Sequence, residues 1–226
     1  MAATTILVPG QKEFKGRPLP LALSPASSAA NSPADLVAYV RANRGALLQQ
    51  ALSHGAVLLR GWTATTPEDF ADVAEALDLD VFPYVGGAAP RTLVVRDVVF
   101  TTNESPPSEP IPFHHEMAQC PSPPQYVLFY CQVPAATGGE TPLILSNPVA
   151  EYMKLKHPAF TAKVLEHGVQ YCRVMPCEDD HSSAIGRSWK ATFQCEDKAG
   201  AEAAMQKIGT TWTWLPNDDV ATVTAV

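Results

Sequence analysis

The stretch Gly55-Ala56-Val57-Leu58-Leu59-Arg60-Gly61 decides how the first part of the chain is organised. A short apolar run between two glycines is typical of a buried strand. Before it, apolar side chains from Leu36 to Leu52 recur at helical spacing, and Ser32 and Pro33 are suited to begin that helix. After it, Thr66 begins a second helical segment. A buried strand between two helices indicates a domain that mixes the two kinds of structure.

Outward from this stretch, the sequence predicts one domain, residues 32–226, preceded by an extended, Pro-punctuated arm, residues 1–31. Turn and cap residues predict further helices from Asn147, from Pro158 to Gly168, and from Ala199 to Ile208. Strands are expected at residues 92–95, 98–101, 126–133, 141–145, 169–175 and 211–214. The uncharged, β-prone end, Val220 to Val226, predicts either a final strand that pairs inside the fold or a sequence that stops within a sheet.

Bulk composition restricts the classes of partner. The chain has 226 residues and a net charge of −7, and its 16 Lys and Arg residues are scattered along it. Binding of phosphate backbones requires clustered basic residues, so we expect no nucleic-acid partner. The chain has no run of about 18 apolar residues, so we expect no membrane span and no membrane partner. The expected ligand is a small-molecule substrate, and the sequence does not indicate an oligomeric state.

The five cysteines form no CxxC pair. Such spacing argues against a disulfide framework or a zinc knuckle and favours reduced, structural thiols. Reduced thiols are typical of a reducing compartment, which predicts a cytoplasmic protein. The small, polar and Arg-poor segment from Ser24 to Ser32 leaves a plastid location open.

The most informative motif is His114-His115-Glu116. On a strand, alternate side chains share a face, so His114 and Glu116 would point one way and His115 the other. An imidazole and a carboxylate on one face can form two arms of a 2-His-1-carboxylate iron site, which leaves iron positions open for a co-substrate and oxygen. A polar pair in a surface loop would give the same triplet, so the residues alone leave both interpretations open.

Four blocks stand out in order along the chain: residues 55–61 with Phe70 in the following helix, Phe113 to Glu116, Gly138 to Pro142, and Gly186 to Phe193. Together they resemble the TauD/TfdA (clavaminate synthase-like) family of oxygenases. The segment Pro83 to Arg91, with residues 102–105, is similar to the plant-type branch of that family. The resemblance covers residues 35–226, nearly the whole of the predicted domain.

The resemblance implies both a fold and an activity. The fold would be α+β and mainly β, a double-stranded β-helix or jelly roll with flanking helices. The activity would be that of an Fe(II)- and 2-oxoglutarate-dependent dioxygenase, which hydroxylates a small molecule and releases succinate and CO2. His114 and Glu116 match two iron ligands of the family, and Thr141 matches a Thr that helps to hold the 2-oxoglutarate carboxylate. Arg91 and Asn103 lie in loops that can face the substrate, with solvated loop positions as the alternative for both.

The chain departs from the family pattern after Glu116. The family has a second iron-binding His far downstream and, soon after it, an Arg that pairs with 2-oxoglutarate. This sequence offers His157, His167 and His181, of which His181 is the candidate replacement, and none is followed by such an Arg in a late strand.

The resemblance therefore implies an incomplete jelly roll in a C-terminally truncated chain. For such a chain we expect weak Fe(II) binding, no succinate release, and a tendency to aggregate or partly unfold. The alternative function is that of a non-catalytic isoform or fragment, which lacks the distal His and Arg.

Overall fold

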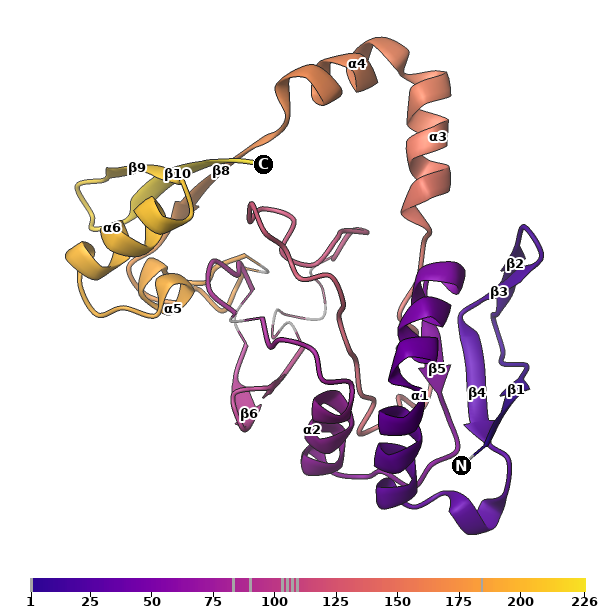
Figure 1. Ribbon diagram of the computed structural model, residues 1–226. Coiled ribbons are helices and arrows are strands. Elements are labelled where there is room, and N and C mark those ends of the chain that lie inside the picture. Colours follow the sequence, from indigo (N-terminus) through magenta and orange to yellow (C-terminus); the bar gives the residue numbers. More distant parts are fainter. Residues whose placement is uncertain are drawn as a thin grey trace. The chain divides into compact units, whose positions relative to one another are not determined.

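The computed structural model describes residues 2–82, 84–89, 91–102, 104, 106, 108, 110–183 and 185–226. The chain divides into two compact units (Figure 1). Unit 1 comprises residues 1–81, 93–100 and 128–138, and unit 2 comprises residues 82–92, 101–127 and 139–226. Each unit has its own hydrophobic cluster. The division into an arm, residues 1–31, and one domain, residues 32–226, stays a prediction from the sequence.

Unit 1 contains a three-stranded sheet in the order β1 (Ala3–Ile6), β4 (Leu21–Pro25) and β5 (Val57–Leu59). β1 and β4 are antiparallel, whereas β4 and β5 are parallel. The predicted strand within residues 55–61 is therefore present as β5. Its partner comes from the N-terminal 31 residues, which are extended because they supply strands to this sheet and not because they stand apart from the core.

Two hairpins and a short 3-10 helix complete the small elements of unit 1. The hairpins pair β2 (Lys12–Phe14) with β3 (Arg17–Leu19), and β6 (Leu93–Val95) with β7 (Val99–Phe100). The 3-10 helix spans Ser28–Ala30. β6 and β7 correspond to the two strands that the sequence predicted between residues 92 and 101.

The helices of unit 1 begin where the capping residues predicted. α1 (Pro33–His54) starts after Ser32, whose hydroxyl accepts from the Asp35 N–H while the Asp35 carboxylate accepts from the Ser32 N–H. α2 (Pro67–Ala76) begins with the same reciprocal arrangement at Thr66. These bonds satisfy backbone donors that a helix N-terminus otherwise leaves free.

The core of unit 1 forms around α1, which packs against the sheet and against α2 (Figure 1). Val40 of α1 is fully buried, and Trp62 stacks on Tyr39 with ring centroids 5.6 Å apart. Removal of apolar surface from water is the main stabilising contribution in such a cluster. Its other buried members are Leu21, Leu23, Leu36, Leu47, Val73 and Ala76.

Unit 2 contains a second three-stranded sheet, in the order β8 (Gln170–Met175), β10 (Val220–Ala225) and β9 (Thr211–Trp214). Both pairs of neighbours are antiparallel. β10 is the central strand, so the β-prone end of the sequence is paired on both sides. The final strand that the sequence predicted is therefore present as β10.

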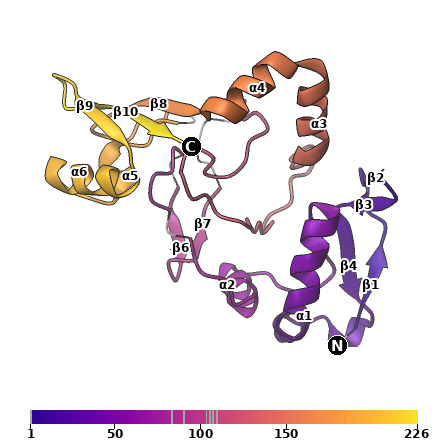
Figure 2. The same cartoon turned by 45° about the horizontal axis from the view of Figure 1, so that its top comes forward.

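Two helices, α5 (Trp189–Phe193) and α6 (Lys198–Lys207), lie on the same face of this sheet in both views (Figures 1 and 2). Between helices and sheet, Trp189 meets Trp214 edge to face, with ring centroids 5.1 Å apart. The other buried members of this cluster are Met175, Phe193, Ala201, Met205 and Val220. This packing makes the sheet and its two helices a single hydrophobic core.

Two further helices precede this sheet, α3 (Ser146–Lys156) and α4 (Pro158–His167), and neither has a buried residue. The strands predicted at residues 126–133 and 141–145 are not formed, and residues 113–116 are not in a strand either. Alternating apolar residues favour an extended backbone, but a strand also requires a hydrogen-bonded neighbour. None of the described sheets includes these segments.

The fold class is thus α+β, as predicted, with sheets of two or three strands in the described part of the chain. It is not mainly β there, because more of the described residues lie in helices than in strands. None of the helices within that part combines the length and the apolar character needed to cross a membrane.

Two leucines of α1 provide a matched test of the unit 1 core. Leu47 is buried, whereas Leu52 is 68% exposed on the same helix. We expect Leu47→Ala to lower the free energy of unfolding by about 2–5 kcal/mol, because it leaves a cavity as well as losing apolar burial. Leu52→Ala should change it by about 0.5 kcal/mol or less. Urea denaturation followed by circular dichroism measures both, and equal effects would contradict the assignment of the core.

Candidate functional site

The loop that carries the predicted iron ligands is built from successive turns and not from a strand. The Ala118 N–H donates to the His115 carbonyl at 3.3 Å, and the Cys120 N–H donates to the Met117 carbonyl at 2.9 Å. Met117 and Cys120 are buried and anchor the loop, and Met117 adopts a positive φ of 57°. The argument from strand alternation therefore does not apply to His114 and Glu116, whose pairing stays a prediction from the family resemblance.

His114 has a defined hydrogen-bonding state. It is exposed, and its ring Nδ1 lies 2.8 Å from the carbonyl oxygen of Pro112. Because a carbonyl only accepts, Nδ1 is the donor in this contact, and in a neutral imidazole Nε2 then keeps its lone pair. A carbonyl on one ring nitrogen is the usual way to fix the tautomer of a metal-binding histidine. His114 is thus arranged to offer Nε2 to a cation.

The neighbouring imidazole has a different partner. Nε2 of His115 lies 2.6 Å from Oγ of Ser146, the first residue of α3. This contact links the loop to the start of the helix and engages the ring nitrogen that His114 leaves free. Of the two histidines, His114 is therefore the better candidate for a metal ligand.

Glu116 is paired with Arg91, a residue that the sequence predicted for substrate binding. Nη2 of Arg91 lies 3.3 Å from Oε1 of Glu116, and the side chains are only 18% and 21% exposed. Nη1 of Arg91 also donates to the Thr101 carbonyl at 3.3 Å. Because the pair is largely shielded from water, its attraction exceeds that of an exposed ion pair. The structure thus brings together a predicted ligand of iron and a predicted ligand of substrate.

Two guanidinium groups lie over the ring of Tyr84. The Cζ of Arg91 lies 5.0 Å from the ring centroid, and that of Arg187 lies 4.7 Å from it. Nη1 of Arg187 also donates to the Tyr84 carbonyl at 3.2 Å, and burial lowers the pKa of Arg187. A Cβ at residue 87 would lie 2.3 Å from a Tyr84 ring atom, so this packing requires Gly87.

The remaining predicted site residues are less defined. Thr141 is exposed in an irregular segment, and Asn103 lies outside the described residues. His157, His167 and His181 are all exposed. Within the described ranges, no three His, Cys, Asp or Glu side chains come together as a group that could hold a metal ion.

Sequence reasoning missed Tyr84, Arg173 and Arg187 as members of a cationic cluster in unit 2. The inward orientation of Arg173 could have been predicted. Alternate residues of a strand lie on one face, so Arg173 lies on the same face as Tyr171 and Met175. The stacking of Arg187 on Tyr84 joins residues 103 positions apart in the chain. Local sequence patterns do not predict a contact between residues so far apart in the chain.

Comparison with known proteins relates this geometry to a family. A family model described as "Taurine catabolism dioxygenase TauD, TfdA family" matches residues 16–182, which include the His114 loop and Thr141. The chain is 44% identical over 220 residues to a clavaminate synthase-like protein of Arabidopsis thaliana, across 96% of this chain and 66% of that protein. It is 26% identical over 168 residues to the dapdiamide synthesis protein DdaC of Enterobacter agglomerans, across 74% of this chain and 48% of that protein. The chain spans less than two thirds of the length of each relative.

Substitution of Tyr84 tests its role as a platform for two cations. Tyr84→Phe keeps the ring and loses one hydrogen bond, from the hydroxyl to the Ala89 carbonyl at 3.2 Å, so we expect a loss of about 0.5–1.5 kcal/mol. Tyr84→Leu also removes the ring from both guanidinium groups, and we expect a further loss of about 1–3 kcal/mol. Urea denaturation of both variants measures the difference. Equal stability of the two would show that the ring itself contributes nothing.

Proposed function

The chain belongs to the TauD/TfdA family, and on that premise we propose that it carries part of the active site of an Fe(II)- and 2-oxoglutarate-dependent dioxygenase. The proposed reaction hydroxylates a small molecule and releases succinate and CO2. The observation that carries the proposal is the match of the family model across residues 16–182, together with the hydrogen-bonding state of His114. The double-stranded β-helix that the family implies is proposed for the whole protein.

The donor set of the His114 loop fits Fe(II) in its chemistry. Imidazole nitrogen and carboxylate oxygen are two of the three ligands in a 2-His-1-carboxylate site. We propose that His114 supplies Nε2 and Glu116 supplies a carboxylate oxygen. When bound, iron and 2-oxoglutarate supply the oxygen chemistry that side chains alone do not perform. The protein's own contribution is to hold these ligands in place and to position the co-substrate and the substrate.

Three other residues have proposed roles around this loop. The Thr141 hydroxyl is proposed to donate to the 2-oxoglutarate carboxylate, and Asn103 is proposed to face the substrate. Nη2 of Arg91 lies 3.3 Å from the Glu116 carboxylate. The same guanidinium repels a cation that approaches Glu116, so it opposes metal binding. Arg91 is free to meet an anionic substrate only if it releases Glu116.

The choice between the two histidines tests the proposed iron site. We expect His114→Ala and Glu116→Ala each to weaken Fe(II) binding by at least about tenfold, because each removes a ligand. His115→Ala should weaken it by no more than about threefold, because its contact is to Ser146 and its effect on the metal is indirect. Anaerobic Fe(II) titration measures the affinities, and His167→Ala, an exposed histidine at the end of α4, is the control.

Loss of iron binding in His115→Ala but not in His114→Ala would overturn this assignment. Succinate release measured on the same samples separates catalysis from metal binding. Release that depends on 2-oxoglutarate and is abolished by His114→Ala supports the dioxygenase. Iron binding without any release favours the non-catalytic alternative.

Competition between Arg91 and iron for Glu116 provides a second test. We expect Arg91→Met to tighten Fe(II) binding by about three- to tenfold, because a cation beside the ligand is removed. Arg91→Lys retains the charge and should leave the affinity within about twofold of the wild type. Anaerobic Fe(II) titration measures both variants. Unchanged affinity in Arg91→Met would show that Glu116 is not the carboxylate that binds iron.

A further inference from the structure

A contact between a serine and a histidine joins two parts of the proposed site that are distant in the sequence. Oγ of Ser146 lies 2.6 Å from Nε2 of His115, and the two residues are 31 positions apart. Ser146 is the first residue of α3, and five positions before it is Thr141, the proposed ligand of 2-oxoglutarate. Both partners belong to unit 2. The contact therefore ties the loop of the proposed iron ligands to the segment that carries Thr141.

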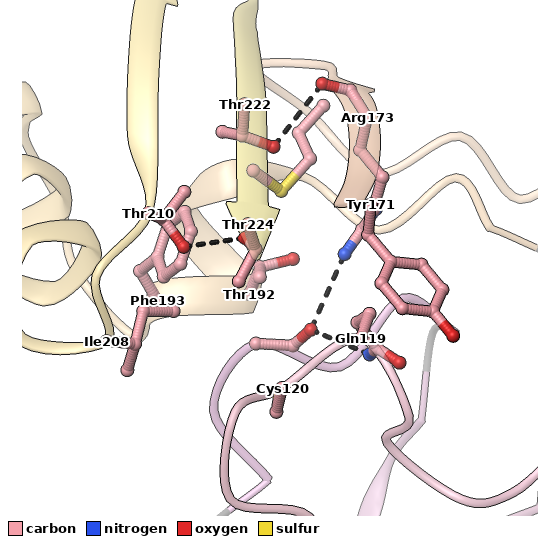
Figure 3. A pocket seen from close by; sticks show the side chains of 12 residues that line it. Gln119, Cys120, Tyr171, Arg173, Thr192, Phe193, Ile208, Thr210, Thr222 and Thr224 are labelled. Atoms are coloured by element: carbon pink, nitrogen blue, oxygen red, sulfur yellow. Dashed lines mark hydrogen bonds between the residues drawn. The ribbon is translucent and has the colours of Figure 1, made fainter. Parts of the chain in front are cut away.

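The two ends of this loop are held in different ways. Beyond Glu116, Gln119 Nε2 donates to the Gly86 carbonyl at 3.1 Å (Figure 3), and Cys120 is buried. The histidine end has no such burial, because His114 and His115 are both exposed. An exposed ring is free to rotate unless a hydrogen bond orients it. The contact with Ser146 is therefore what orients the ring of His115.

The hydroxyl of Ser146 does not serve as the cap of α3. The N-cap residue is Leu145, which makes no side-chain hydrogen bond to the helix. Ser146 follows the cap position, where the first turn does not require a hydroxyl. Within the described part of the chain, the hydrogen bond of its side chain is the one to His115. Replacement of Ser146 should therefore affect the loop and not the helix.

This contact engages Nε2 of His115 whichever atom donates. If the hydroxyl donates, the bond uses the lone pair of Nε2. If Nε2 donates, that nitrogen carries a hydrogen in place of a lone pair. A metal ion needs a ring nitrogen with a free lone pair. Nε2 of His115 is therefore closed to a cation as long as Ser146 is in contact with it.

The adjacent imidazole has the opposite arrangement. The Pro112 carbonyl lies 2.8 Å from Nδ1 of His114, and none of the described residues makes a hydrogen bond to its Nε2. Because both rings are exposed, burial does not distinguish them as ligands. What distinguishes them is the nitrogen that is engaged, which is Nδ1 in His114 and Nε2 in His115.

We propose that Ser146 is a positioning residue that selects the metal ligand of this loop. By engaging Nε2 of His115, it leaves His114 as the imidazole whose Nε2 a divalent cation can reach. Ser146 acts through His115 and does not itself touch the metal. This inference rests on the proposed function, because it requires a metal site in the His114 loop.

Imidazole nitrogen resonances of the metal-free chain provide the first test. The Nε2 resonance of His115, identified by its loss in His115→Ala, should shift in Ser146→Ala. It should stay near its wild-type position in Ser146→Thr, which retains the hydroxyl. Ser28→Ala, which replaces an exposed serine at the start of the 3-10 helix, is the matched control. A resonance that does not move in Ser146→Ala would overturn the proposal.

Zn(II) then tests which histidine is selected. It is a suitable probe because it has no redox chemistry and binds imidazole nitrogen. In the wild type, we expect Zn(II) to shift the Nε2 resonance of His114 and to leave that of His115 in place. In Ser146→Ala, both rings should respond, because the second Nε2 is then open. A response of His115 in the wild type would contradict the proposal.

Double variants separate selection of the ligand from a structural role of Ser146. We expect His114→Ala to weaken Zn(II) binding by at least about tenfold, because it removes a ligand. Addition of Ser146→Ala should recover at least about threefold of this loss, because His115 becomes available. Addition of Ser146→Thr should recover nothing. Loss of a merely structural contact would weaken binding further, so the absence of recovery in the first double variant overturns the proposal.

Failure of the proposed function gives a different result. If Zn(II) shifts neither histidine of the wild type, or if His114→Ala binds as tightly as the wild type, the metal site itself is wrong and the proposal falls with it. If the wild type engages His114 and Ser146→Ala changes neither ring, the metal site stands and the role of Ser146 alone is overturned.

Discussion

The backbone of Gly86 and Gly87 is the point on which the arrangement of unit 2 depends. The Gly86 N–H donates to the Thr192 carbonyl of α5 at 2.8 Å, and the Gly86 carbonyl accepts from Gln119 and from Arg173 of β8. Two glycines thus join the loop that follows the predicted iron ligands, one strand of the sheet and one helix above it. Close approach of this kind leaves no room for side chains, as the position of the Tyr84 ring against Gly87 shows.

The same junction concentrates positive charge in an otherwise acidic chain. Arg91 and Arg187 lie on one tyrosine ring, and burial, together with the charge of Arg187, lowers the pKa of Arg173. Glu116 balances part of this charge by pairing with Arg91. Metal binding and charge balance therefore make opposing demands on Glu116, because a carboxylate that turns toward a cation leaves Arg91 without its partner. This opposition couples the proposed iron site to the cationic cluster.

Local signals in the sequence predicted local structure well. Ser32 and Thr66 each precede a proline and a segment with apolar residues at helical spacing, and both cap the helices that begin there. The alternating segment from residue 126 to 133 did not become a strand, because alternation specifies an extended backbone and not the neighbour that a ladder needs. In the candidate site, likewise, local motifs were predicted from the sequence and long-range contacts were not. Family blocks pointed to His114 and Glu116, whereas the Arg91–Glu116 pair and the Tyr84 platform depend on how the chain folds back on itself.

The edge-to-face contact of Trp189 with Trp214 has a spectroscopic consequence. Electronic transitions of two indoles in fixed contact couple, so this pair should give a near-ultraviolet circular dichroism signal that exists only while the core of unit 2 is packed. In unit 1 the indole of Trp62 is stacked on a phenol ring, with ring planes 28° apart, and has a different environment. The molecule therefore carries separate optical reporters for its two cores, and their loss on heating or in denaturant can be followed independently in one unlabelled sample.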